Sequence, residues 1–389
     1  MTSRNIRNST KLASVIGAVC ATVLTLSSSA AHAATAGSDH SDTLAALKAY
    51  QAAAGPGAAV HAGDGSESWT LSAGTGTVNA DRPIKADEHI RIGSQTKTFT
   101  AAVVLQLAEE GRVSLDAPID DYLPGAVTGN GYDGTRITVR HLLQHTGGLG
   151  AYTPSPGLKT PPSNPDGTFS LSAVVRYALD ASPPVSAPGE GFTYSNTGYY
   201  ILGMLIEKLT GQPVHKAVTE RVIEPLGLPR TFFPAPGDRA LPTPAVNGYH
   251  GVRVGSFYLW VPAVSYDPSL FSSAGAMIST LEDLSAFYQA LATGKVLSAK
   301  SLAEMRTVRQ VNTGTGYGLG LQTYEPSCGG TARGHSGGVP GYQTFTLTMD
   351  DGRYVSIVTN LLVQVGQRPD AQLMQLLDTA LCEDAPQRD

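Results

Sequence analysis

Residues 91–100 read Arg-Ile-Gly-Ser-Gln-Thr-Lys-Thr-Phe-Thr and lead directly into an apolar segment, Ala101 to Glu110. The run contains Ser94-x-x-Lys97, and residues three apart share one face of a helix. If Ser94 lies in the first turn, the Lys97 amine lies beside its hydroxyl. A serine needs such a base to act as a nucleophile, and a lysine serves only where burial or nearby positive charge keeps it neutral. The plainer alternative is a helix N-cap serine followed by a solvated lysine.

A second motif, Tyr194-Ser195-Asn196, stands before a helical pattern at Gly198–Leu209. Tyr194 and Asn196 point the same way if the loop is extended. A phenol near a lysine can move protons, and an amide can hold both a substrate carbonyl and the lysine. By itself this motif also fits an asparagine helix cap beside a half-buried tyrosine.

A third motif, Gly334-His335-Ser336-Gly337-Gly338, stands before a strand pattern. Its glycines let a ligand backbone approach closely, and an edge strand here can pair with an extended peptide and supply an oxyanion N–H. The same run matches the G-x-S-x-G nucleophile elbow of α/β-hydrolases. That fold needs a histidine after the serine, and none follows His335 in the sequence.

The order of periodic segments predicts an α/β (α+β) fold, in which helices flank an antiparallel sheet and a mainly helical subdomain is inserted. Alternation and turn residues predict strands near both ends of the chain: Gly57–His61, Glu67–Ala73, Gln343–Met349 and Tyr354–Val358. Helical spacing predicts the following helices: Ser41–Ala54, Val139–Gln144, Leu171–Leu179, Thr197–Leu209, Val214–Ile223 and Pro369–Leu381. We therefore expect both ends of the chain to share one sheet.

The first 33 residues have the features of a secretory signal peptide. A basic start is followed by the apolar run Leu12–Leu26 and by Ala31-His32-Ala33, a small-residue cleavage site. We expect cleavage after about Ala33, a secreted protein and no membrane anchor, since the residues before Cys20 make a poor lipid-attachment motif. The expected domain is 34–382, with an α/β part at about 41–114 and 292–382, a helical part at about 115–291 and a tail at 383–389.

Charge and cysteine content narrow the possible partners. The net charge is −5 and no basic cluster stands out, so we expect no nucleic-acid partner. Signal cleavage would leave two cysteines, Cys328 and Cys382. In an exported protein these most simply form one disulfide, and two reduced buried thiols are the alternative.

Taken together and in this order, the three motifs resemble those of the penicillin-recognising serine hydrolases, over roughly Asp42 to Cys382. The set is most similar to the secreted actinomycete D-Ala-D-Ala carboxypeptidases, which have His-x-Gly where most relatives have Lys-Thr-Gly. Three further runs support the resemblance: His141-Leu-Leu-Gln-His145-Thr-Gly-Gly-Leu149, Tyr317-Gly-Leu-Gly-Leu321 and Gly341-Tyr342.

The resemblance implies roles for the motif residues. Ser94 would form an acyl-enzyme, Lys97 and Tyr194 would share base and proton-delivery duties, and Asn196 would position the substrate amide. The backbone N–H groups of Ser94 and Gly338 would form the oxyanion hole, with Ser336 and Gly337 beside the substrate. His335 would act as an electrostatic and proton-relay partner, which predicts activity that changes between about pH 5 and 8.

The implied partners are a peptidoglycan stem peptide or another small acyl substrate, with β-lactams as inhibitors or substrates. We expect neither a cofactor nor a metal. His141 and His145 have a zinc-like spacing, but position 142 is leucine and no third ligand is evident, so a structural role is favoured. Trp260, in the run Phe257–Trp260, is either a wall of the substrate pocket or packing under a loop.

Two departures bear on the substrate. A carboxypeptidase must neutralise a terminal carboxylate, which arginine does best. The basic residue that these carboxypeptidases have after Tyr-Gly-x-Gly-Leu is here Gln322, and Gly338 replaces a polar residue. Arg333 is a candidate substitute. The expected function is that of a secreted serine hydrolase, most simply a D-Ala-D-Ala carboxypeptidase. The departures weaken this expectation and strengthen esterase, amidase or D-aminopeptidase activity as alternatives, with β-lactamase and a non-enzymatic penicillin sensor as further alternatives.

Overall fold

The protein is described by a computed structural model that covers residues 39–154, 160–254, 257–263, 265–362, 369–383 and 385. All elements below belong to the unit Ser38–Asp389. The expected signal peptide, residues 1–33, lies outside the described residues. Across the ranges given, no helix combines the length and apolar character needed to cross a bilayer.

Eight antiparallel strands form the main sheet, in the order β2-β1-β14-β13-β12-β11-β10-β9. Their bounds are β1 Gly57–Gly63, β2 Ser68–Gly74, β9 Arg309–Asn312, β10 Thr315–Tyr317, β11 Gln322–Tyr324, β12 Ala332–Val339, β13 Tyr342–Thr348 and β14 Tyr354–Thr359. β1 pairs with β14, so that Val60 lies opposite Ile357. The expectation that both ends of the chain share one sheet is confirmed.

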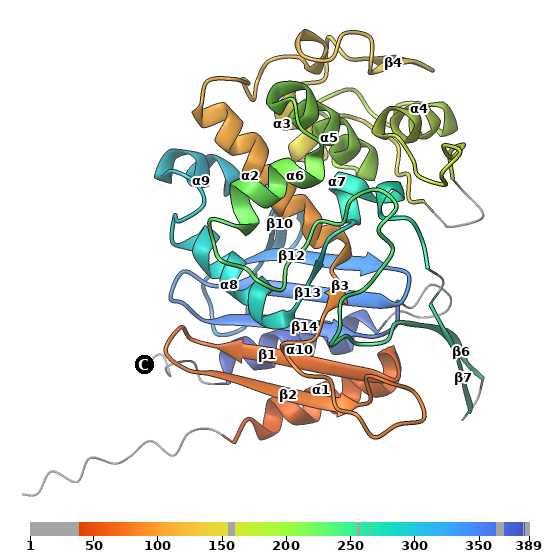
Figure 1. Ribbon diagram of the computed structural model, residues 1–389. Coiled ribbons are helices and arrows are strands. Elements are labelled where there is room, and N and C mark those ends of the chain that lie inside the picture. The colour runs from red at the N-terminus through yellow and green to blue at the C-terminus, as the bar shows by residue number, and fades with distance from the viewer. Residues whose placement is uncertain are drawn as a thin grey trace, which may run out of the picture. The chain divides into compact units, whose positions relative to one another are not determined.

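Helices cover both faces of this sheet (Figure 1). On one face α1 (Ser41–Ala54) lies against α10 (Asp370–Cys382), because each helix turns an apolar stripe toward the sheet. The buried cluster on this face includes Leu47, Tyr50, Val60, Val355, Ile357, Leu373, Leu376 and Leu377. A disulfide between Cys328 and Cys382 joins α10 to the turn between β11 and β12, as expected.

On the other face lies α2 (Thr96–Glu109), which is buried without interruption from Thr96 to Leu105. A helix that is buried on all sides must be surrounded by other elements, and α2 contacts α5, α6, α7 and α9. Figure 1 shows α3 to α6 gathered at the end of the unit away from β1 and β2. The bounds are α3 Val139–Leu143, α4 Leu171–Ala181, α5 Asn196–Thr210, α6 Val214–Val218, α7 Ser272–Gly275 and α9 Ala299–Met305, and a π-helical turn, Thr219–Ile223, follows α6.

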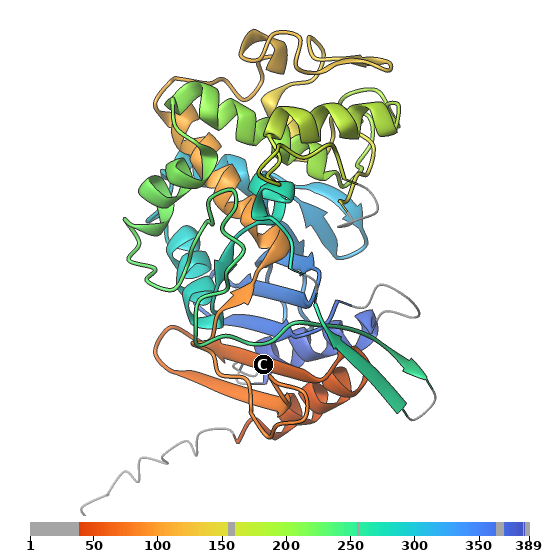
Figure 2. The same cartoon turned by 45° about the vertical axis from the view of Figure 1, so that its right-hand side comes forward.

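Several further elements lie outside the helices and strands named above from the sequence. The region 115–291 includes a hairpin, β6 (Tyr249–Val254) and β7 (Phe257–Pro262), which extends away from the main sheet in Figures 1 and 2. It also includes α8 (Leu281–Ala292), which packs on β13 and β14 of the sheet. Helical periodicity marks a buried face but does not say which layer that face meets. The short pairs are β3 (Ile90–Arg91) with β8 (Ile278–Ser279), and β4 (Thr128–Gly129) with β5 (Tyr132–Asp133).

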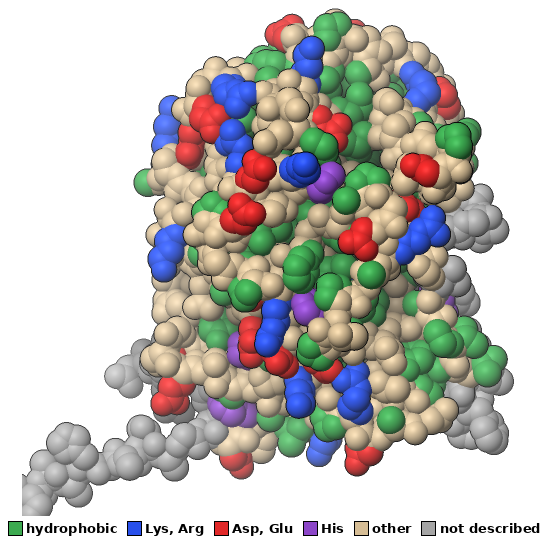
Figure 3. All heavy atoms as spheres, in the orientation of Figure 1, with side chains coloured by type: hydrophobic (Ala, Val, Ile, Leu, Met, Phe, Trp, Pro, Cys, Tyr) green, Lys and Arg blue, Asp and Glu red, His purple; other side chains and the backbone are tan. Residues whose placement is uncertain are grey.

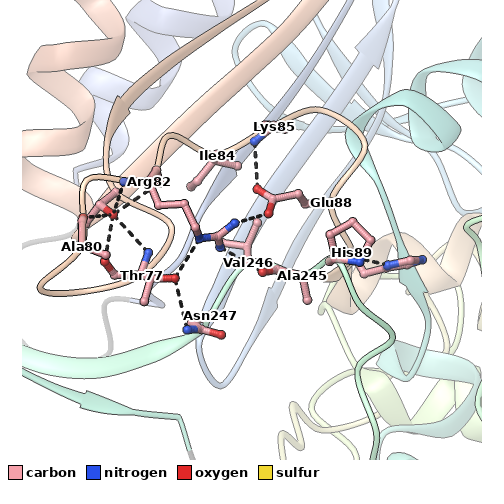
Figure 4. Close-up of polar contacts among 12 residues, drawn as sticks. Thr77, Ala80, Arg82, Ile84, Lys85, Glu88, His89, Ala245, Val246 and Asn247 are labelled. Carbon is pink, nitrogen blue, oxygen red and sulfur yellow. Dashed lines mark hydrogen bonds and ion pairs between the residues drawn. The ribbon is translucent and has the colours of Figure 1, made fainter.

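A polar network anchors the segment that leads into β3 (Figure 4). Arg82 forms an ion pair with Glu88, which is buried, and its guanidinium also donates to Ala245 O at 2.9 Å. Glu88 accepts a second hydrogen bond from the Lys85 N–H at 2.9 Å. A buried carboxylate is tolerated when it is paired in this way. The network holds the approach to β3, and so the turn that follows it, against residues 244–247.

Charged side chains are mixed on the surface. On the face drawn in Figure 3, Lys and Arg lie among Asp and Glu. Ion pairs of this kind occur in the structure, where Arg140 pairs with both Asp116 and Glu304. Opposite charges at such spacing largely cancel, so no strong field of one sign covers this face.

Candidate active site

Ser94 lies in a short 3₁₀ turn, Gly93–Gln95, between β3 and α2. The serine thus precedes the α-helix, where it had been expected in the first turn, and Lys97 is the second residue of α2. Gly93 has φ 54°, and a Cβ there would stand 2.7 Å from the Gly338 nitrogen. Only glycine fits this turn, and its presence brings the Gly338 N–H of β12 next to Ser94.

Lys97 is fully buried behind the partly exposed Ser94. Its Nζ lies 3.1 Å from Ser94 Oγ, 2.7 Å from Asn196 Oδ1 and 2.8 Å from Ala274 O. Burial lowers the pKa of Lys97 well below its usual value, because the ammonium loses its hydration.

The partners of Lys97 determine where a neutral amine directs its lone pair. Ala274 O can only accept, and Asn196 Oδ1 can only accept because the Asn196 Nδ2 is turned to donate to Tyr152 O at 3.0 Å. The two N–H bonds of the amine go to these oxygens. The lone pair then faces the Ser94 hydroxyl, which is the geometry that a general base requires.

Tyr194 lies beside this pair. Lys97 Nζ is 5.0 Å from the centre of the Tyr194 ring. Burial raises the pKa of the Tyr194 phenol well above 10, and the nearby Ser94 hydroxyl opposes this only in part. Among the described residues no group meets the buried phenol oxygen in hydrogen-bonding geometry. A protonated phenol whose O–H is available for a hydrogen bond is thus placed next to the serine and the amine.

His335 is fully buried in β12, and both its ring nitrogens are engaged. Nε2 lies 2.8 Å from the Tyr317 hydroxyl, and Nδ1 lies 2.6 Å from Ser336 O. Burial lowers the pKa of His335 to about 3. The expectation that His335 titrates between about pH 5 and 8 is therefore wrong, because the ring is sealed from the water that would stabilise its charge.

The free edge of β12 begins where its pairing with β11 stops. β11 pairs with β12 only as far as Gln322 opposite Gly334, and no strand of the described chain continues on that side of residues 336–339. Gln322 Oε1 instead accepts a hydrogen bond from the Ser336 N–H at 3.0 Å. Arg333, the candidate substitute cation, pairs with Asp350 at 2.9 Å. Neither side chain therefore presents an unpaired positive charge to this edge.

The other residues predicted for the site include Gly337, Trp260 and the two cysteines. Gly337 lies where a Cβ would stand 1.9 Å from Ile92 O, so the absence of a side chain lets β12 pack against the Ser94 turn. Trp260 lies on β7 opposite Gly251, in the hairpin. The disulfide stands apart, at the end of α10.

Sequence reasoning missed three residues. Tyr152 orients Asn196 through its carbonyl, which accepts from the Asn196 amide, and its side chain is buried. His145 and Tyr317 make buried contacts behind the site. His145 belongs to the run 141–149 and Tyr317 to the run 317–321. Both runs were noted in the sequence, but neither residue was given this role.

His141 bonds to the Thr138 N–H in the cap of α3. The described residues contain no group of three or more metal-ligating side chains.

The fold and the buried Ser–Lys pair define a class of serine hydrolases that place lysine beside the nucleophilic serine. The sequence profile of the Beta-lactamase family matches residues 44–378, and the chain belongs to this family. Penicillin-binding protein 4 of Amycolatopsis lactamdurans is 30% identical over 317 residues, which are 75% of this chain and 76% of that protein. Esterase EstB of Burkholderia gladioli is 29% identical over 301 residues, 68% and 76% of the two chains.

Among solved structures, a D-stereospecific amidohydrolase from Streptomyces sp. is similar at a TM-score of 0.77 and 38% identity. The alignment covers 90% of this chain and all of that one. Proteins similar to this chain thus include an esterase, a penicillin-binding protein and an amidohydrolase, so similarity alone does not define the substrate.

Proposed function

We propose that this protein is a serine amidohydrolase that cleaves amides of D-configured acyl groups through an acyl-enzyme on Ser94. The observation that carries the proposal is the buried Lys97 amine, whose lone pair faces the Ser94 hydroxyl at 3.1 Å. A nucleophile, a neutral base and an unengaged phenol at one point are the parts that acyl transfer needs.

The reaction follows from this geometry. Ser94 Oγ attacks the substrate carbonyl while its proton passes to Lys97 Nζ. The oxyanion is held by the N–H groups of Ser94, in the turn that precedes α2, and of Gly338, on the free edge of β12. The C–N bond breaks as the leaving amine takes a proton delivered through Tyr194. Water then attacks the acyl-enzyme and restores the Ser94 hydroxyl.

The substrate class rests on what lies at the edge of β12. A terminal carboxylate needs a cation, but Gln322 stands at the expected position and bonds to Ser336, while Arg333 is paired with Asp350. An uncharged amide or ester group needs no such partner. The likeness to a D-stereospecific amidohydrolase and to an esterase supports the same assignment. D-Ala-D-Ala carboxypeptidase activity, which the motifs imply, is the less supported alternative.

The nucleophile is tested by intact mass after brief exposure to an activated ester of D-phenylalanine and, separately, to benzylpenicillin. We expect one acyl adduct on the wild type and none on Ser94→Ala, whose turnover should fall on the order of a millionfold. Ser66→Ala, an exposed serine, is the matched control. Turnover retained in Ser94→Ala would contradict the proposal.

The substrate class is tested with two peptides that both end in D-Ala-D-Ala and differ only in a free or amidated C-terminus. We expect kcat/KM for the amidated peptide to equal or exceed that for the free acid. A preference of about a hundredfold for the free acid, on the order of 2.7 kcal/mol, would instead require a carboxylate-binding site and favour a carboxypeptidase.

We further infer that the protein is exported. The support is the signal-like pattern of residues 1–33 and the Cys328–Cys382 disulfide, a bond that persists in oxidising surroundings. N-terminal sequencing of the protein in culture medium tests this, and the expected first residue is Ala34.

A further inference from the structure

A continuous line of hydrogen bonds connects the second motif to the third behind the candidate active site. The Ser195 N–H donates to His145 Nδ1 at 3.2 Å, and His145 Nε2 lies 3.1 Å from the Tyr317 hydroxyl. The same hydroxyl lies 2.8 Å from His335 Nε2, and His335 Nδ1 lies 2.6 Å from Ser336 O. All three side chains are at most 4% exposed.

The two ends of the line determine the direction of every hydrogen bond in it. A backbone N–H can only donate, so His145 Nδ1 is an acceptor and its proton is on Nε2. A backbone carbonyl can only accept, so His335 carries its proton on Nδ1 and accepts at Nε2. Tyr317 satisfies both rings at once, since its oxygen accepts from His145 and its O–H donates to His335.

This arrangement changes what His335 can do. Both nitrogens are occupied and the ring is neutral, so His335 has no proton to offer to a substrate. Its ring nitrogens bond to Tyr317 and, within its own strand, to the Ser336 carbonyl next to the free edge of β12. Through its hydrogen bond with Tyr317, His335 links β12 to β10.

The other end of the line bears on Tyr194. The His145 ring lies against the Tyr194 ring with centroids 4.3 Å apart, and His145 Nδ1 accepts from the N–H of Ser195, the residue after Tyr194. His145 itself has φ 59°, an uncommon conformation for a non-glycine residue. Because hydrogen bonds at both nitrogens hold the His145 ring in place, that ring limits where the Tyr194 phenol can lie.

We propose that His145 and Tyr317 are positioning residues that hold the Tyr194–Asn196 loop and the His335–Gly338 strand in one register around Ser94. The proposal rests on the proposed function, because the register matters only if Ser94, Tyr194 and Gly338 act on one carbonyl. Neither residue touches that carbonyl. Their effect comes through Ser195 and His335, which adjoin the groups that do.

The first test observes the resting protein, labelled with ¹⁵N at histidine. We expect the nitrogen pattern of an Nδ1–H tautomer for His335 and of an Nε2–H tautomer for His145, assigned with His335→Asn and His145→Asn. In Tyr317→Phe both signals should shift, because each ring loses its partner. Tyr288→Phe removes an equally buried hydroxyl, bonded to Thr98 at 3.1 Å, and should leave both unchanged. An Nε2–H tautomer at His335, or no shift in Tyr317→Phe, would overturn the proposal.

The second test measures acylation of Ser94 by the activated ester. We expect Tyr317→Phe to lower kcat by about 10- to 100-fold with KM within about threefold, as small misplacements of reacting groups do. Tyr288→Phe should keep its kcat within about threefold of the wild type. Equal losses in the two variants would refute a positioning role. A wild type that forms no acyl-enzyme would refute the proposed function instead, and the tautomers would still decide whether the line of hydrogen bonds exists.

Discussion

Replacing Asn196 with Asp tests whether Lys97 must be neutral. The wild-type amide accepts from Lys97 Nζ at 2.7 Å and carries no charge. A carboxylate of almost the same shape would favour the ammonium form. Because an ammonium has no lone pair for the Ser94 proton, Asn196→Asp should lower activity at neutral pH.

The size of the effect follows from the distance. Two unit charges 2.7 Å apart attract by about 6 kcal/mol at an effective dielectric constant of 20. Desolvation of the new carboxylate opposes this by several kcal/mol, which leaves about 3 kcal/mol in favour of the ammonium. A bias of that size raises the pKa of Lys97, so the neutral fraction, and with it kcat/KM, falls by up to about a hundredfold at pH values below the wild-type pKa and by less above it.

The assay is kcat/KM for an amide substrate between pH 5 and 10. The base works only when deprotonated, so activity is lost as the pH falls through the pKa of Lys97, and a raised pKa moves that loss to higher pH. Asn196→Asp should thus recover activity as the pH rises. Asn196→Ala loses the same hydrogen bonds without adding charge and should be slow without this upward displacement. If both variants have the wild-type acid limb, the neutral-lysine reasoning is refuted.

Three further predictions concern stability and specificity. Replacing Cys328 and Cys382 with serine should lower the free energy of unfolding by about 4 kcal/mol for a separation of 54 residues, and an unchanged urea midpoint would contradict this. His335 has its pKa lowered from 6.5 to about 3 in the folded protein. As the pH falls from about 6.5 toward 3, the unfolded chain gains the proton first, so stability measured by urea unfolding should drop by about 1.4 kcal/mol per pH unit, and less steeply in His335→Gln. Gln322→Arg should shift the preference between the two D-Ala-D-Ala peptides toward the free acid by about tenfold, and no shift would mean that position 322 does not face the leaving group.

Local patterns were sufficient for much of the fold and for the central pair. Ser94 and Lys97 meet because they are three positions apart along a helical path, and this depends on no other part of the chain. The terminal strands and α1 were predicted because alternation and helical spacing are local properties. The short strands β9 to β11 were missed, since three or four residues carry too little pattern to be distinguished from a loop.

The sequence by itself determined the order of the motifs, the Ser–Lys spacing and the cysteines that pair, because each is a matter of residue type and separation. Only the tertiary structure decided the protonation states. Burial favours the neutral forms of Lys97 and His335, because distant elements remove water from around them, and His335 accepts from Tyr317, on another strand. The place of Gln322 was likewise decided by where β11 ends beside β12. Hydration and contact across strands depend on the packed whole, so no local pattern records them.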